Sequence, residues 1–399
     1  MELAAFRDEI KAWLAANVPS SMHGLPLVMP SETASEPAEI TRARQQYLKG
    51  MSARGYTAPR WPKAYGGAGL TADEARVLQE ELDALRLPPA LVGMGVSMIG
   101  PTLLVHGSEE QKLRFLPKIA SGEHRWCQGF SEPGAGSDLA SLRTDAVPDE
   151  SGERYIINGS KIWTSGAQFA NWMFMLVRTD RTSKHNGITF ILVDMKTPGI
   201  EVKPIRLISG TSMFCEVFFQ DVVAEARDVV GSVNNGWTVA KTLLSFERSG
   251  MGTGTLGAGT RRAAASSGHL IALAKQTAGE VDGQVADPSL RERLAQLLMD
   301  ELALSLTVER TTAARKETGA VGPEMSMFKL YQSELGQRRD ELTLCLRGSD
   351  ALALDAANGS EEGNAATRMW LHAKATTIWG GTSEIQRNII AKRVLRLPG

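Results

Sequence analysis

The spacing of apolar positions divides the chain into three parts. Residues 1 to about 120 carry charged, amphipathic segments with helical spacing, clearest over residues 36–55 and 71–86, and predict a helical domain. From Trp126 to about Val223, short β-branched and aromatic runs predict a β domain. Helical spacing returns at Gly236 and continues to Val394. The pattern predicts an α+β protein, mostly α, with domains over residues 1–122, 123–230 and 231–399.

Within the β domain, four runs have the composition of strands: residues 155–157, 172–177, 188–193 and 216–219. Asn158 and Gly159 follow the first run and precede another short run at Ser160. An Asn-Gly pair suits a two-residue type I′ turn, because both of its positions need a positive φ. We therefore expect a hairpin at Asn158-Gly159.

Residues 87–107 contain no Asp, Glu, Lys or Arg over 21 positions, about the length that spans a bilayer. Three prolines and four glycines interrupt this stretch. Because these residues break a continuous helix, a buried core helix or pocket wall is favoured over a membrane span.

One carboxylate lies on an apolar helical face. Trp237, Ala240, Leu244 and Glu247 are spaced i, i+3, i+7 and i+10, so Glu247 projects where apolar residues point. Desolvation at such a place raises the pKa of a carboxylate toward neutrality, as a general base requires. The alternative is a partly exposed glutamate paired with a basic neighbour such as Lys241 or Arg248.

Composition narrows the classes of function. The chain has 44 basic and 45 acidic residues, and no basic run interleaved with aromatics suggests a nucleic-acid partner. Three widely separated cysteines, Cys127, Cys215 and Cys345, predict neither a disulfide framework nor a metal site, and fit a reducing cytoplasm. The first 19 residues have the charge pattern of a domain helix, unlike a signal peptide. We therefore expect a cytoplasmic protein without a membrane span.

Two glycine patterns resemble a dinucleotide fingerprint, at residues 252–257 and 134–140. Neither sits in an evident βαβ unit, so a Rossmann site is not expected. The second pattern lies in residues 128–142, where small and hydroxyl residues suit a flat polar heterocycle or a phosphate. Further along, Trp163 stands beside Thr164 and Ser165, either as an aromatic plate next to hydroxyls or as part of a β core.

Five segments in order along the chain resemble the acyl-CoA dehydrogenases. They are residues 60–70, 106–124, 130–138, 155–172 and 378–393, which include the sequences FSEPGAGSD and IWGGTSEIQRNIIAKR. The resemblance runs over nearly the whole length. It implies a helical N-terminal domain, a barrel-like β-sheet middle domain and a C-terminal four-helix bundle.

The resemblance also implies FAD as cofactor and assigns residues to it. Gln128, Ser131, Trp163 and Ser165 would lie along the isoalloxazine ring, and Ser137 would contact the acyl-CoA. Gly381, Thr382 and Glu384 would lie near the FAD diphosphate or adenosine, although several relatives carry an uncharged glutamine where Glu384 stands. No metal is implied.

The reaction implied is α,β-dehydrogenation of an acyl-CoA thioester to the trans-2-enoyl-CoA. Many relatives place the catalytic glutamate where this chain has Gly380, so that base is absent here. A minority branch places it on the first long helix of the C-terminal domain, directly before an arginine, as in Glu247-Arg248. The resemblance therefore implies Glu247 as base, the Gly380 backbone as a substrate contact, and Arg248 as a charge-setting neighbour at the substrate.

Assembly is the second departure. Relatives usually carry an Arg-x-x-Phe-Gly segment and a Gly-Gly-x-Gly segment that reach the neighbouring subunit's FAD. The corresponding residues, 288–297 and 347–364, lack both patterns. The expectation is a dimer or tetramer that passes electrons to an electron-transfer flavoprotein. The missing segments favour an assembly in which a sister acyl-CoA dehydrogenase chain completes the FAD site.

Two other functions remain open from the sequence. A flavin-dependent oxidase or monooxygenase would keep the fold and change the reaction. A non-catalytic partner subunit of a heteromeric dehydrogenase would have no need for a carboxylate on an apolar helix face, which Glu247 provides. Acyl length, branching and pathway do not follow from these residues. The small Gly380 leaves room for a branched or ring-bearing acyl group, and residues 87–107 could line a pocket wide enough for a steroid side-chain thioester.

Overall fold

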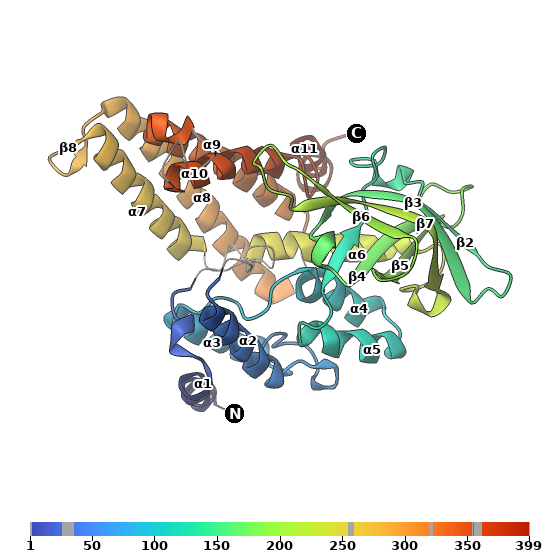
Figure 1. The fold of residues 1–399 in the computed structure, drawn as a ribbon. Coiled ribbons are helices and arrows are strands. Elements are labelled where there is room, and N and C mark those ends of the chain that lie inside the picture. Colours follow the sequence, from blue (N-terminus) through green and yellow to red (C-terminus); the bar gives the residue numbers. More distant parts are fainter. Residues whose placement is uncertain are drawn as a thin grey trace. The chain divides into compact units, whose positions relative to one another are not determined.

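The computed structural model describes residues 2–25, 36–253, 259–318, 322–352, 354 and 361–398. Side chains are described for all of these except residues 248–253, 259–267, 312, 314–318 and 361–362. The chain forms two compact units (Figure 1). Unit 1 comprises Met1–Ile205 and Ser212–Phe246, and unit 2 comprises Arg206–Thr211 and Glu247–Gly399.

Unit 1 begins with three amphipathic helices, as the periodicity predicts. They are α1 (Leu3–Asn17), α2 (Ala38–Ala53) and α3 (Ala72–Ala84). Their apolar stripes meet in one core, in which Ile10, Tyr47 and Leu78 are almost completely buried. Thr71 starts α3 with a capping box, because its hydroxyl accepts from the Glu74 N–H while the Glu74 carboxylate accepts from the Thr71 N–H.

The uncharged stretch forms a helix that packs inside unit 1. A π-helical turn over Gly95–Ile99 leads into α4 (Gly100–His106), and α5 (Glu109–Ala120) follows. Gly100 permits the packing, since a Cβ there would lie 2.1 Å from the Trp61 ring. The buried-helix prediction is confirmed. No helix within the described part of the chain is long and apolar enough to cross a membrane.

The middle of unit 1 is a curled seven-stranded sheet in the order β1-β4-β2-β3-β7-β6, with β5 also paired to β4. The strands are β1 (Trp126–Gly129), β2 (Asp145–Pro148), β3 (Arg154–Ser165), β4 (Trp172–Arg178), β5 (Ile188–Asp194), β6 (Ile200–Ile205) and β7 (Phe214–Glu225). All four predicted strand runs are present in β3, β4, β5 and β7. The sequence pattern does not predict strands β1, β2 and β6.

Strand β4 is buried on both faces, which explains its uninterrupted apolar sequence. Trp172, Phe174 and Leu176 pack with residues of α4, α5 and α6 (Gly236–Thr253). The alternate residues Met173, Met175 and Val177 pack on the inside of the curled sheet, against β3 and β7. The sheet therefore has one core within its curl and another beneath the helices.

The hairpin predicted at Asn158-Gly159 is wrong. Both residues lie inside the continuous strand β3, where the pairing with β7 shifts register between Ile157 and Gly159. The Asn158 amide exchanges hydrogen bonds with Asp221, and a Cβ at Gly159 would lie 2.7 Å from the Thr144 Cα. The Asn-Gly pair thus serves a β-bulge and a close approach between strands, instead of a turn.

Unit 2 is helical, as the periodicity predicts. Its helices are α7 (Gly259–Ala278), α8 (Pro288–Thr318), α9 (Met325–Arg347), α10 (Glu361–Ala373) and α11 (Ser383–Ile389), with a short hairpin of β8 (Glu280–Val281) and β9 (Gln284–Val285). Leu270, Leu297 and Leu342 lie in the core shared by α7, α8 and α9. The Arg339 guanidinium and the buried Glu301 carboxylate, 2.8 Å apart, join α9 to α8.

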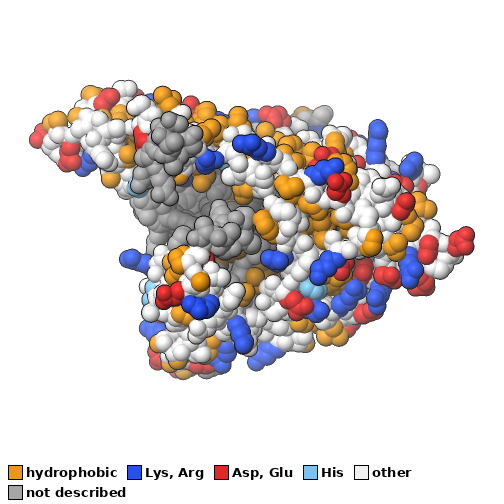
Figure 2. All heavy atoms as spheres, viewed as in Figure 1, with side chains coloured by type: hydrophobic (Ala, Val, Ile, Leu, Met, Phe, Trp, Pro, Cys, Tyr) orange, Lys and Arg blue, Asp and Glu red, His pale blue; other side chains and the backbone are white. Residues whose placement is uncertain are grey.

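The surface carries mixed charge. On the face shown in Figure 2, acidic and basic side chains are interspersed over the described residues, in keeping with a formal net charge of −1. This face lacks the continuous basic field with which proteins hold nucleic-acid backbones.

Candidate functional site

The loop after β1 is the first part of the candidate site. Glu132 and Ala135 exchange two backbone hydrogen bonds of 3.0 Å, which close the loop on itself. The buried Glu132 carboxylate accepts from the N–H groups of Arg143 at 2.6 Å and Thr144 at 2.9 Å. These bonds hold the loop that carries Ser131 and Ser137.

A completely buried lysine ties this loop to β3. The Lys161 ammonium donates to the Glu132 carboxylate at 2.8 Å and to the Phe130 carbonyl at 3.2 Å. Burial lowers the pKa of Lys161 to about 8, against the opposing effect of Glu132. Burial alone would raise the pKa of Glu132, but the charge and hydrogen bond of Lys161, with the bonds from Thr144 and Arg143, lower it. At neutral pH the two groups therefore form a buried ion pair.

A second bulge in β3 turns Trp163 outward. Between Lys161 and Thr164 the pairing with β7 shifts register, and Trp163 adopts a φ of +61°. Its indole is 55% exposed, while the neighbouring Thr164 is fully buried. The interpretation of Trp163 as part of the β core is therefore wrong: the bulge presents an aromatic face at the surface of unit 1.

The structure brings the predicted unit 1 residues onto two joined segments. The Ile162 N–H donates to the Ser131 carbonyl at 2.9 Å, so Ser131 lies next to the bulge. Gln128 on β1 and Ser165 at the end of β3 are partly buried, and Ser137 is exposed on the loop. An outward indole thus stands beside small hydroxyl side chains and an amide.

In unit 2, two left-handed glycines form the turn before α11. Gly380 has a φ of +62° and Gly381 a φ of +90°, conformations that glycine adopts without strain. The buried Gln386 amide donates to both of their carbonyls, at 2.9 and 3.2 Å. A Cβ at Gly381 would lie 2.5 Å from that amide nitrogen. The turn therefore favours glycine at position 381, and the hydrogen bonds from the Gln386 amide stabilise it.

The residues after this turn begin helix α11. The Thr382 hydroxyl accepts from the Ile385 N–H at 3.3 Å and caps the helix. Glu384 is exposed and lies 3.8 Å from the Arg387 guanidinium. Hydrogen bonds with its own backbone N–H and Thr382 lower the pKa of Glu384. Gly380, Gly381, Thr382 and Glu384 are therefore contiguous on one turn and helix start.

Glu247 lies on the buried arc of α6. Ala240 and Leu243 are almost completely buried, and Glu247 follows them at i+7 and i+4 on the same face. Its own side chain is partly buried, whereas Lys241, the alternative ion-pair partner, is exposed. Arg248 belongs to α6, but its side chain lies outside the described residues, as do residues 254–257 of the first glycine pattern.

Apolar spacing does not identify Lys329 as a site residue, yet this lysine interacts with both the glycine turn and Glu247. Lys329 on α9 is 9% exposed, and its ammonium donates to the Gly381 carbonyl at 2.7 Å. Burial lowers the pKa of Lys329, and the nearby charges of Glu247, Glu334 and Glu384 oppose that shift. The available signal was its position four residues after the buried Met325, on an apolar helical face.

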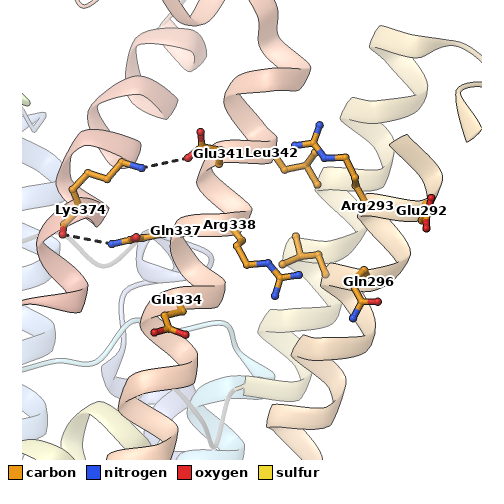
Figure 3. Close-up of a pocket in the computed structure, with 10 residues that line it drawn as sticks. Glu292, Arg293, Gln296, Glu334, Gln337, Arg338, Glu341, Leu342 and Lys374 are labelled. Atoms are coloured by element: carbon orange, nitrogen blue, oxygen red, sulfur yellow. Dashed lines mark hydrogen bonds and ion pairs between the residues drawn. The ribbon is translucent and has the colours of Figure 1, made fainter. Parts of the chain in front are cut away.

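A charged cleft of about 730 Å³ is a separate feature of unit 2 (Figure 3). Helix α8, helix α9 and Lys374 line it, and Lys374 pairs with Glu341 while Arg338 pairs with Asp300. Its acidic and basic side chains balance one another. None of the site residues predicted from the sequence lines this cleft.

Comparison with known families decides the identity of the fold. Three family models match in succession: the acyl-CoA dehydrogenase N-terminal domain over residues 2–123, the middle domain over residues 127–222 and the C-terminal domain over residues 234–395. The chain belongs to the acyl-CoA dehydrogenase family. It is therefore an oxidoreductase, and the α+β fold class predicted from the sequence is confirmed.

Related sequences and structures agree with the family. Acyl-CoA dehydrogenase IpdE1 of Mycolicibacterium smegmatis is 38% identical over 100% of this chain and 98% of its own length. The solved Tcur3481-Tcur3483 steroid ACAD superposes with a TM-score of 0.76 at 28% identity, over 99% of this chain and 97% of that chain. The ChsE4-ChsE5 complex from Mycobacterium tuberculosis gives a TM-score of 0.74 at 26% identity, over 100% and 98%.

Acyl-CoA dehydrogenases are FAD-dependent, and the unit 1 residues fit a flavin chemically. The outward Trp163 indole offers a flat face for an aromatic ring system. Ser131 and Ser165 offer hydroxyl groups, and Gln128 an amide, for the polar edge of such a ring. The ion pair of Lys161 and Glu132 ties the loop that carries Ser131 to strand β3, which carries Trp163 and Ser165.

Proposed function

We propose that this chain catalyses the FAD-dependent α,β-dehydrogenation of an acyl-CoA thioester, with Glu247 as the base. The observation that carries the assignment is the partly buried carboxylate on the buried arc of α6, in a chain whose C-terminal turn has Gly380 at the position of the usual base. A carboxylate held away from bulk water is suited to abstract a weakly acidic proton.

The chain's own groups supply the proton transfer and the polarisation of the substrate. The Glu247 carboxylate takes the α proton of the thioester, and the α carbon's electron pair forms the new double bond as the β hydrogen leaves as hydride. The Gly380 N–H donates to the thioester oxygen, where negative charge develops. FAD, when bound, supplies the acceptor of the hydride. Arg248 sets the charge around the base.

We assign flavin and acyl-CoA contacts to the residues that the family resemblance implies. Gln128, Ser131, Trp163 and Ser165 hold the ring system, and Ser137 contacts the acyl-CoA. Gly381, Thr382 and Glu384 hold the diphosphate or adenosine part. Support comes from the outward indole in unit 1 and from the two left-handed glycines and capped helix start in unit 2, because successive backbone N–H groups in such a turn suit an anion.

We propose a bulky or branched acyl group as the substrate class. Gly380 replaces the side chain that many relatives carry beside the thioester, which leaves space for an α-methyl or ring-bearing chain. The similarity to a steroid ACAD supports the same substrate class.

The decisive experiment is anaerobic mixing of the FAD-loaded protein with straight-chain, α-methyl and ring-bearing acyl-CoAs. We expect bleaching of the flavin absorbance with formation of the 2-enoyl-CoA, fastest for the branched or cyclic thioesters. Turnover of straight chains alone would refute the bulky-substrate assignment. Oxygen consumption that matches product formation would favour the oxidase or monooxygenase alternative. A FAD-loaded protein that no thioester bleaches would favour a non-catalytic subunit.

We propose that a second acyl-CoA dehydrogenase chain of different sequence covers one face of α8. Met299, Leu302 and Leu306, spaced i, i+3 and i+7, are 53–57% exposed there, and such a stripe is typical of an association surface. Residues 288–297 and 347–364 lack the segments with which self-dimers of the family reach a neighbouring FAD. An electron-transfer flavoprotein is the proposed electron acceptor of the assembled enzyme.

For this assembly we expect the chain purified alone to hold less than one FAD per chain, and coexpression with a sister chain to restore it. Leu302→Glu should lower the assembled mass measured by light scattering, because it places a charge in an apolar interface. Val147→Glu, at an equally exposed apolar position of unit 1, is the control. Full FAD occupancy and activity in a homo-oligomer would remove the proposal.

A further inference from the structure

Lys329 makes a hydrogen bond to the glycine turn and a charge interaction with the proposed base, Glu247. Its ammonium donates to the Gly381 carbonyl at 2.7 Å, and it lies close enough to Glu247 for their charges to interact. It is 9% exposed, so water screens its charge little. A buried lysine loses solvation and side-chain entropy, a cost that ordinary surface lysines avoid.

The contact with Gly381 restrains the turn from the side of α9. The two left-handed glycines have no side chains of their own to fix them, so their carbonyls are held by Gln386 and Lys329. Gly380 directly precedes Gly381, whose carbonyl accepts the hydrogen bond from Lys329. Among the described residues, the Gly380 N–H donates to no backbone acceptor, so it is available to donate to a substrate oxygen.

The charges around Lys329 come from three elements. Glu247 lies on α6, Glu334 one turn further along α9, and Glu384 at the start of α11. Arg387 engages both of the latter two, Glu334 at 2.7 Å and Glu384 at 3.8 Å. Arg387 therefore partly neutralises these two carboxylates.

We infer that Lys329 is a positioning residue for the proposed reaction: it anchors the turn that presents the Gly380 N–H and places a positive charge near the Glu247 carboxylate. This inference rests on the proposed function. The ammonium itself touches neither substrate nor flavin. It acts on the base through charge and on the substrate donor through the Gly381 carbonyl.

The test compares four variants as FAD-loaded protein. Lys329→Met removes the charge and the hydrogen bond, Lys329→Gln retains a donor without the charge, and Lys329→Arg retains both. Lys374→Met is the matched control, because Lys374 also pairs with a glutamate of unit 2, Glu341, but does not bond the glycine turn. The readouts are kcat, KM, the pH profile of kcat/KM, the melting temperature and bound flavin per chain.

For Lys329→Met we expect kcat to fall about 10- to 100-fold with little change in KM, since the donor and base lose their alignment for the transition state. The acidic limb of the pH profile should move to higher pH, because loss of a nearby positive charge disfavours an ionised carboxylate. Lys329→Gln should show the same movement. Lys329→Arg should restore the limb, and Lys374→Met should leave kcat and the profile unchanged.

A purely structural lysine would give a different result. A lower melting temperature with unchanged kcat and an unmoved limb would overturn the inference. If Lys329→Met does not fold, the comparison of Lys329→Gln with Lys329→Arg decides. An acidic limb at the same pH in both variants would overturn the inference. Glu247→Gln is measured in parallel. If the Glu247→Gln protein is active, the base assignment and this inference are both wrong. If it is inactive while the Lys329 variants keep normal kcat and pH profiles, this inference alone is wrong.

Discussion

Replacing Glu247 with glutamine should reduce the rate of substrate-dependent flavin bleaching by about 10³-fold, within the range that a general base contributes. Glutamine has nearly the same shape and remains on the buried arc of α6, but it does not accept the α proton. Stopped-flow absorbance under anaerobic conditions measures the effect. Bound flavin and the melting temperature should stay near the values of the unaltered protein, because the substitution removes a charge from a partly buried position without creating a cavity.

Glu341→Gln is the control for this prediction. It makes the same chemical change in the same unit, at an exposed carboxylate that pairs with Lys374 in the charged cleft. We expect normal bleaching from this protein. If Glu247→Gln also bleached at the normal rate, the base would be another residue and the proposed mechanism would be wrong.

Replacing Lys161 with methionine should destabilise unit 1 by about 3–5 kcal/mol, the usual effect of removing one partner of a buried ion pair. The Glu132 carboxylate would remain buried with two backbone N–H donors and without its ion-pair partner. Because Glu132 holds the loop of Ser131, we also expect a loss of bound FAD. Thermal unfolding and flavin absorbance per chain measure the two effects.

Two further variants separate the ion pair from other causes. The double variant Glu132→Gln/Lys161→Met should be less destabilised than Lys161→Met alone, since it leaves no unpaired charge. Lys184→Met removes a lysine from an exposed pair with Asp138, at 2.9 Å, and should have little effect on stability. A double variant as unstable as the single one would show that lost packing, and not charge, is responsible.

The stability deficit of Lys161→Met should shrink as the pH falls through the range in which glutamate carboxylates titrate. In the unaltered protein the pKa of Glu132 is lowered, so its stabilising contribution is present above the unfolded value and is lost as the pH falls through the folded value. Without Lys161, Glu132 loses the charge and the hydrogen bond that do most to lower its pKa, so the variant loses less stability than the unaltered protein as the pH falls. The two melting curves should therefore converge on acidification. A deficit that stays constant with pH would contradict a charged Glu132.

Local patterns predicted the elements of this fold well where a single periodicity dominates. The amphipathic helices of unit 1 and the double-sided apolar strand β4 have such patterns, and the structure contains them. Strands β1, β2 and β6 are short or largely polar, so no run distinguished them from loops. The Asn-Gly pair was assigned to a hairpin because its local preference for positive φ suits a turn and a bulge alike.

The candidate site likewise contains features that follow from the local sequence and features that do not. The helical face of Glu247 and the glycines at positions 380 and 381 could be inferred from the sequence, because helix geometry and left-handed φ values are local properties. The outward direction of Trp163 could not, since it depends on a bulge formed by pairing with β7.

By itself, therefore, the sequence determined the family, the helical and strand segments with strong periodicity, and the face of α6 on which Glu247 lies. Only the tertiary structure decided that Lys161 meets Glu132 and that Lys329 meets Gly381. These partners are 29 and 52 positions apart in the chain. Contacts across such separations form only when distant elements pack together, so no local pattern of hydrophobic and polar residues encodes them.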